Sequence, residues 1–217
     1  FYFAMLMAKI THKDIRKMGS GNPGTMNMSR EFGLKIGIIT FFCDAFKGGI
    51  PALISYFIYR GYVFAGTDVV VSDFTRYFCG LCVIVGHIFP VTMKFRGGKG
   101  IASTLGLFWI NLGCENPWFL LIGFGCLWLI AFYIVATEWG SMGSLLGVTG
   151  FSLWQGVIFW LRYSAELNNG YVAAVFSVIL ALNLLTWCAH HKNILRLLAG
   201  EEHRTSVKKM LHKKKKA

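Results

Sequence analysis

A turn of the form Gly-x-Gly-x-x-Gly, GSGNPG, lies at residues 19–24. This spacing is typical of dinucleotide-binding proteins, but only where the turn follows a strand and opens a helix inside a βαβ unit. The chain has no strand-like run beside the turn, which argues against NAD binding. Glycine turns also expose backbone N–H groups that attract phosphate, and Arg16, Lys17 and Arg30 flank this one. The residues therefore favour either a phosphate site or a tight loop whose basic side chains meet lipid headgroups.

A second glycine-rich loop, GGKG at residues 97–100, runs directly into a helix that we expect to begin near Ile101. Backbone N–H groups at the start of that helix would point towards an anion. The loop is not a Walker A motif, because that motif needs Ser or Thr directly after the lysine. Here Gly100 follows Lys99, and Ser103 is too far along to hold Mg²⁺. The loop predicts a second phosphate site.

A third polar stretch, HHKNILRLLAGEEHR, covers residues 190–204. His190, Asn193 and Arg196 recur at intervals of three, so they share one face if the preceding helix continues through them. The histidine then lies where an active site at the membrane surface would be. The alternative is a charged helix end, with cations at the C-terminus of the helix.

Membrane helices must position these three stretches. Of the 217 residues, 55% are hydrophobic and only 15% are charged, whereas a soluble domain carries about 25% charged residues. Five apolar segments have a length within the roughly 17–25 residues that a spanning helix needs. They are Ile36–Tyr59, Tyr77–Met93, Trp118–Ala136, Gly143–Leu161 and Tyr171–Ala189.

Two further apolar segments are short. Ile101–Gly113 is expected to be a tilted or partial span. Residues 1–8, FYFAMLMA, are too few to cross a membrane, so we expect the printed sequence to start inside a first, clipped helix. The predicted fold class is all-α: a single integral-membrane domain over residues 1–217, with about seven transmembrane helices.

The distribution of Lys and Arg predicts the orientation. With the C-terminal tail in the cytoplasm and the N-terminus outside, the cytoplasmic segments hold 18 basic residues and the external segments 3. All three polar stretches then lie on the cytoplasmic face, which suggests two phosphate-bearing substrates bound together. The basic tail at 205–217 predicts attachment to anionic lipid rather than to nucleic acid.

One charged pair lies inside a span. Asp44 and Lys47 stand one helical turn apart in the first long segment, where an isolated charge costs roughly 2.5–3.5 kcal/mol on insertion scales. We expect them to form an ion pair that stabilises a bend near Pro51, with direct substrate contact as the alternative.

Taken together, the three stretches resemble the signature motifs of the bacterial acyl-phosphate:glycerol-3-phosphate acyltransferases. Residues 17–30, KMGSGNPGTMNMSR, are similar to the first motif, residues 86–104 to the second, and residues 190–202 to the third. Motif order and hydropathy agree along essentially the whole chain. Thr25, Met26 and Ser103 depart from the usual pattern, which affects the expected local geometry only.

The resemblance implies a reaction. The family transfers an acyl chain from acyl phosphate to the 1-hydroxyl of glycerol 3-phosphate, giving lysophosphatidate and phosphate in phospholipid biosynthesis. It implies no coenzyme A, cofactor or metal, and a location in the bacterial inner membrane with the active site at the cytoplasmic face. The expected functional partner is the enzyme that makes acyl phosphate.

The resemblance and the residue types together nominate the site. The expected catalytic residues are His190, Ser20, Lys99 and Arg30. The expected substrate-binding residues are Gly19, Gly21, Asn22, Gly24, Asn27, His87, Gly97, Gly98, Gly100, Ser141, Asn193 and Arg196.

The identity of the base stays open between two candidates. His190, with an ordinary pKa near 6.5, suits a general base, and the oxygens of the acyl phosphate could accept the same proton. An acyl-Ser20 intermediate is a less favoured third route, because no base stands beside Ser20 in the sequence.

Two other function classes are weighed against the acyltransferase. None of the six histidines has an Asp five residues later, so the His-x₄-Asp acyltransferase class is excluded.

A membrane transporter for a phosphate-bearing solute would also collect basic loops on a helix bundle, but it should show repeats and broken helices at the midplane. A scaffolding protein would explain the helices but not the glycine loops.

Overall fold

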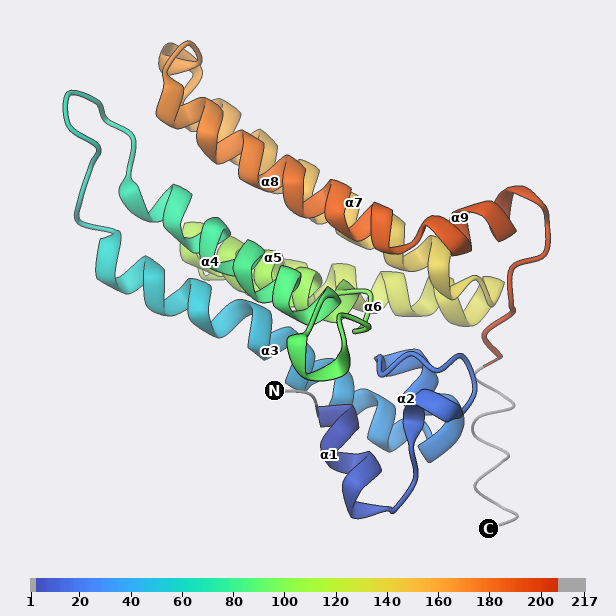
Figure 1. The fold of residues 1–217 in the computed structure, drawn as a ribbon. Helices are drawn as coiled ribbons and strands as arrows, with labels where there is room; N and C mark the ends of the chain where they lie inside the picture. The colour runs from blue at the N-terminus through green and yellow to red at the C-terminus, as the bar shows by residue number, and fades with distance from the viewer. Residues whose placement is uncertain (1–2, 207–217) are drawn as a thin grey trace.

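The computed structural model describes residues 3–206, and it is a bundle of helices (Figure 1). Within that range the β-type pairing is one isolated antiparallel bridge between Val63 and Val70. The α-helices are α1 (Phe3–Ile10), α2 (Thr25–Phe32), α3 (Leu34–Tyr59), α4 (Val71–Ile88), α5 (Ile101–Glu115), α6 (Trp118–Thr137), α7 (Gly140–Arg162), α8 (Gly170–Ala189) and α9 (His191–Leu198). Three short 3₁₀ turns, η1 (Ile15–Lys17), η2 (Val91–Met93) and η3 (Ser164–Glu166), lie in the connections.

Five of these helices are long and apolar enough to cross a membrane: α3, α4, α6, α7 and α8. They coincide with the five predicted spans, so the all-α membrane fold class is confirmed. Helix α5 has 15 residues, or about 22 Å at 1.5 Å per residue, and α1 has 8. The orientation of the termini stays a prediction, and most of the basic tail, residues 207–217, lies outside the described residues.

Helix α5 is the centre of the bundle, and glycines let α3 approach it closely. A Cβ at Gly48 would lie 2.1 Å from the carbonyl oxygen of Ser103, and one at Gly106 would lie 2.2 Å from that of Ala45. Small residues at such crossings allow backbone-to-backbone contact, as is usual in membrane bundles. This contact fixes the start of α5, and with it the glycine loop that precedes α5.

The end of the bundle opposite the three motifs holds a charge network in which Asp73 and Arg76 are buried. Arg76 Nη2 lies 2.9 Å from Asp73 Oδ1, Arg162 Nη1 lies 2.7 Å from Asp73 Oδ2, and Glu115 pairs with both arginines. The sequence-based boundary at Tyr77 was wrong, since α4 begins at Val71. Arg76 therefore lies inside α4 rather than in the external segment before it, because a paired charge is tolerated in a membrane helix where an isolated one is not.

The last long helix does not continue through the third motif. Helix α8 ends at Ala189 and α9 begins at His191. The N–H of His190 bonds to the carbonyl of Trp187, 2.9 Å away, in a tightened turn. His190 therefore stands at the junction, while Asn193 and Arg196 project from α9.

Candidate active site

The GGKG loop is seated on the end of α4. The N–H of Gly97 donates to Ile88 O (3.1 Å) and that of Gly98 donates to His87 O (3.2 Å). Gly100 has φ +80° and caps α5, a conformation that favours glycine. A Cβ on Gly98 would lie 2.1 Å from His87 Nε2, so the loop tolerates no side chain there without a shift of the buried imidazole.

Lys99 leads into a polar cluster built from three distant segments. Its ammonium contacts Asn193 Oδ1 on α9. Asn193 Nδ2 donates to Ser141 Oγ, at the start of α7, and to Glu202 Oε1, both at 2.7 Å. Ser141 Oγ donates to Glu202 Oε1 at 2.5 Å, and Arg196 Nε donates to Glu202 Oε2 at 2.9 Å. An arginine, an amide and a hydroxyl thus converge on one carboxylate, and Lys99 is linked to it through Asn193.

The electrostatics of this cluster follow from burial and from the surrounding cations. Burial lowers the pKa of Lys99 to about 8; Glu202 opposes this shift, and Arg196 and Arg30 add to it. Burial raises the pKa of Glu202, but hydrogen bonds from Ser141, Asn193 and Arg196 outweigh burial, so the net shift is downward. The cluster therefore has an excess of positive charge, suited to an incoming phosphate.

His190 is buried beside the cluster, only 3% exposed. Its Nδ1 lies 2.9 Å from the carbonyl oxygen of Thr186. A carbonyl can only accept, so Nδ1 carries the proton and Nε2 is an acceptor in the neutral ring. Burial, with a further contribution from Lys99, lowers the pKa of His190 to about 4. The ring is neutral at physiological pH and is a weaker base than its ordinary pKa suggests.

The GSGNPG turn is braced by Asn27 from the first turn of α2. Its Oδ1 accepts from the N–H of Ser20 at 3.1 Å, and its Nδ2 donates to Met18 O at 3.0 Å. Gly19 and Gly21 have φ of +55° and +69°, which explains glycine at both positions. The side chain of Asn27 is thus engaged in holding the turn, while Ser20 is exposed.

Two polar atoms beside this turn lack partners. Asn22 Oδ1 and Thr25 Oγ1 are buried, and neither has a hydrogen-bond partner within residues 3–206. Gly24 is the N-cap of α2 and supplies no side-chain cap. Buried polar groups in folded proteins are nearly always hydrogen-bonded; of these two atoms, Thr25 Oγ1 can donate and Asn22 Oδ1 can only accept.

The segment after α9 joins the first motif to the other two. Arg30 Nη2 donates to Thr205 Oγ1 at 3.0 Å, and the N–H of Thr205 donates to Glu138 O at 2.7 Å. Gly140, at the start of α7, allows this close passage, because a Cβ there would lie 2.9 Å from Thr205 Oγ1. Residues 201–206, here called the strap, therefore run from the α9 cluster to Arg30.

The structure brings most of the nominated residues to one end of the bundle. Lys99 and Ser141 both contact Asn193, Arg196 joins them through Glu202, His190 adjoins them, and Arg30 approaches through the strap. Asn27 and His87 lie beneath the glycine loops as supports. Sequence reasoning missed Glu202 and Thr205, although Glu202 is the last residue of the third motif.

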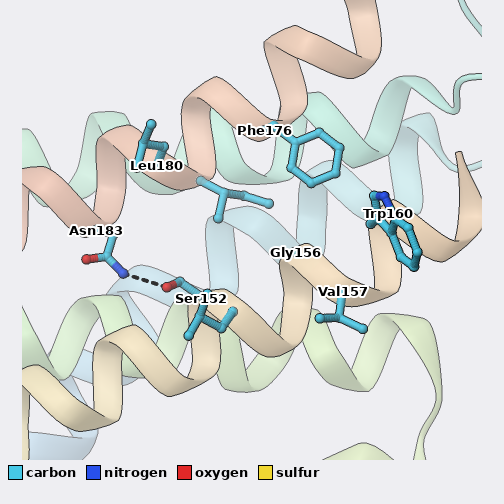
Figure 2. A pocket seen from close by; sticks show the side chains of 9 residues that line it. Ser152, Gly156, Val157, Trp160, Phe176, Leu180 and Asn183 are labelled. Carbon is cyan, nitrogen blue, oxygen red and sulfur yellow. Dashed lines mark hydrogen bonds between the residues drawn. The ribbon is translucent and has the colours of Figure 1, made fainter. Parts of the chain in front are cut away.

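A separate groove lies between α7 and α8 (Figure 2). It has a volume of about 350 Å³ and is lined mainly by apolar side chains such as Trp160, Phe176 and Leu180. Asn183 Nδ2 donates to Ser152 Oγ at 2.5 Å along its wall. None of its lining side chains is cationic.

The sequence profile of the glycerol-3-phosphate acyltransferase family matches residues 1–200. The chain belongs to this family. It is 35% identical over 215 residues to the glycerol-3-phosphate acyltransferase of Aquifex aeolicus, covering 93% of this chain and 91% of that protein. It is 36% identical over 206 residues to that of Thermoanaerobacter pseudethanolicus, covering 94% and 89%.

A solved structure agrees with this assignment. The crystal structure of PlsY (YgiH), an integral membrane glycerol 3-phosphate acyltransferase in its glycerol 3-phosphate form, superposes with a TM-score of 0.73. It is 28% identical and covers 97% of this chain and 91% of that one. The lysophosphatidic acid form gives a TM-score of 0.72. The protein is therefore a membrane glycerol-3-phosphate acyltransferase, and the transporter alternative is set aside.

Proposed function

We propose that this acyltransferase takes its acyl chain from acyl phosphate and transfers it to the 1-hydroxyl of glycerol 3-phosphate. The observation that carries the proposal is the convergence of Lys99, Ser141, Asn193 and Arg196 at the end of the bundle that holds both glycine loops. Two anionic substrates must be brought together here. Hydrogen-bond donors and cations that are already fixed in position stabilise developing negative charge, and in many enzymes they account for most of the rate enhancement.

Each glycine loop is assigned one phosphate. The GGKG loop, with Lys99, holds the phosphate of glycerol 3-phosphate. Ser20, Asn22 and Arg30 hold the phosphate of the donor, a role supported by the adjacent Thr25 hydroxyl, which is buried, unpartnered and able to donate to a phosphate oxygen. The Glu202 carboxylate accepts hydrogen bonds from Ser141, Asn193 and Arg196. When glycerol 3-phosphate binds, its phosphate replaces this carboxylate as the acceptor.

The proton leaves the glycerol hydroxyl in two stages. Nε2 of His190 accepts the hydroxyl hydrogen bond and aims the oxygen at the acyl carbonyl carbon. As the new C–O bond forms and the C–O bond to phosphate breaks, Nε2 takes the proton and then passes it to the released phosphate. Phosphate is the better final acceptor, because even an esterified phosphate has a second pKa near 6, whereas the pKa of buried His190 is about 4.

The site is assigned to the cytoplasmic face of a bacterial inner membrane. The support is the predicted excess of Lys and Arg in the cytoplasmic segments, 18 against 2 once Arg76 is placed inside α4. A soluble dianion can then enter from the cytoplasm while the acylated donor enters from the lipid. An enzyme that makes acyl phosphate is the expected functional partner.

The test uses purified protein in detergent with palmitoyl phosphate as donor. Phosphate release should depend on glycerol 3-phosphate and should need neither coenzyme A nor a metal ion. Lysophosphatidate should form in equal amount. An absolute need for acyl-CoA or Mg²⁺ would contradict the proposal.

A further inference from the structure

The Asp44–Lys47 ion pair inside α3 contacts His87, the residue beneath the GGKG loop. Lys47 Nζ lies 2.9 Å from Asp44 Oδ1, one helical turn away. The same ammonium lies 2.6 Å from Nδ1 of His87, in the last turn of α4. Asp44 and His87 are buried, so three polar groups from two membrane helices meet inside the bundle.

The contact with Lys47 determines which nitrogen of His87 carries the proton. An ammonium group has only N–H donors, so Nδ1 of His87 accepts. The neutral ring therefore carries its proton on Nε2. Nε2 is the ring atom that faces Gly98, because a Cβ on Gly98 would lie 2.1 Å from it. The ion pair thus fixes both the tautomer and the orientation of the ring beneath the loop.

Displacement of this ring would move the loop. The N–H of Gly98 is bonded to the carbonyl of His87 itself, at 3.2 Å. Lys99 follows directly, and its ammonium contacts Asn193 across the site. A rotated imidazole would press on Gly98 and shift the lysine that faces the substrate phosphate.

We propose that Asp44 and Lys47 are positioning residues of this acyltransferase. Their ion pair holds His87 in one tautomer and orientation, and His87 sets the position of Gly98 and Lys99 for the phosphate of glycerol 3-phosphate. The proposal rests on the role proposed above for the GGKG loop. It goes beyond a local helix brace, which would affect only the packing of α3 on α5.

The test is the double variant Asp44→Asn/Lys47→Met, which leaves no lone charge in the span. The KM for glycerol 3-phosphate should rise about tenfold, since a small misplacement of a binding group costs up to about 10²-fold. The KM for acyl phosphate should stay within about twofold, because that substrate is assigned to the other loop. Lys47→Arg, which keeps a charged donor, should recover part of the loss.

The matched control is another buried i,i+3 pair, at the opposite end of the bundle. Asp73→Asn/Arg76→Met should lower the Tm and leave the KM for glycerol 3-phosphate unchanged. If Asp44→Asn/Lys47→Met behaves in the same way, the pair is only a brace and the proposal is wrong.

A mutant cycle with His87→Gln tests whether the ion pair acts on the GGKG loop through His87. If the pair acts through the imidazole, adding Asp44→Asn/Lys47→Met to His87→Gln should change the KM by no more than about twofold. A full further tenfold rise would overturn the proposal. If the GGKG loop instead binds acyl phosphate, Gly98→Ala would raise the KM for acyl phosphate rather than that for glycerol 3-phosphate. The mutant cycle would still measure whether the ion pair acts through His87.

Discussion

Gly98 is the residue where an added side chain would most directly disturb the proposed phosphate site. In Gly98→Ala the new Cβ meets His87 Nε2 at 2.1 Å, and the ring is held by Lys47. The loop must shift, so the KM for glycerol 3-phosphate should rise about tenfold, or about 1.4 kcal/mol of binding free energy. Steady-state kinetics with each substrate varied in turn measure this.

Gly86→Ala is the control for that substitution. It adds the same methyl group next to His87, but no atom lies within 4 Å of the new Cβ. Both KM values should be unchanged. An equal effect of the two variants would show that the loss at Gly98 is not local to the loop.

His190 tests the proposed path of the proton. His190→Ala should lower kcat, because the glycerol hydroxyl loses its acceptor. The pH profile of the variant should keep the shape of the wild-type profile above pH 5, since the wild-type pKa is about 4 and the ring is already neutral. A wild-type acid limb near pH 6.5 that vanishes in His190→Ala would instead identify histidine as the titrating base.

The pKa of Lys99 predicts the pH above which activity should fall. Its pKa is lowered to about 8 by burial in the substrate-free protein. The ammonium is therefore charged below pH 8 and loses its charge above it, so kcat/KM for glycerol 3-phosphate should fall as the pH rises through about 8. Lys99→Arg should move this limit upward, because Arg stays charged.

Removal of the Glu202 carboxylate should lower the pH at which activity begins to fall. Glu202 raises the pKa of Lys99 against the effect of burial, so Glu202→Gln should shift the fall in kcat/KM below that of wild type. Titration of kcat/KM from pH 6 to 10 compares the three proteins. Identical profiles would rule out Lys99 as the titrating group.

At the scale of elements, the charge network at the far end joins α4, α5 and α7. Arg76 is 1% exposed and contacts both Asp73 and Glu115. Arg76→Met leaves the two carboxylates with Arg162 alone, so unfolding should become easier by about 3–5 kcal/mol, as for other broken buried pairs. Thermal unfolding in detergent measures the loss. The KM values of the folded fraction should not change, because the network lies opposite the site.

At the scale of the whole molecule, topology is the open prediction. Single cysteines at Ser20, Arg96 and Arg204, all exposed positions, are introduced after replacement of the six native cysteines. An impermeant thiol reagent applied to intact cells should label none of them, and all should react after lysis. Labelling of any of the three in intact cells would reverse the assigned orientation.

The sequence by itself determined the spans and the chemistry of the motifs. Span length and hydropathy are local properties, so five helices were placed within a few residues, apart from the start of α4. Glycine loops with flanking lysine or arginine predict phosphate binding wherever they fold. The types of residue at the site were therefore visible in the printed chain.

Only the tertiary structure decided which of these residues act on one another. Lys99 and Asn193 are 94 positions apart, and Ser141 and Glu202 are 61 apart. No local pattern encodes such contacts, because they depend on how the helices pack. The same holds for the pKa of His190, which was expected near 6.5 and is about 4. Burial lowers it, and burial is a property of the packed bundle rather than of the residue.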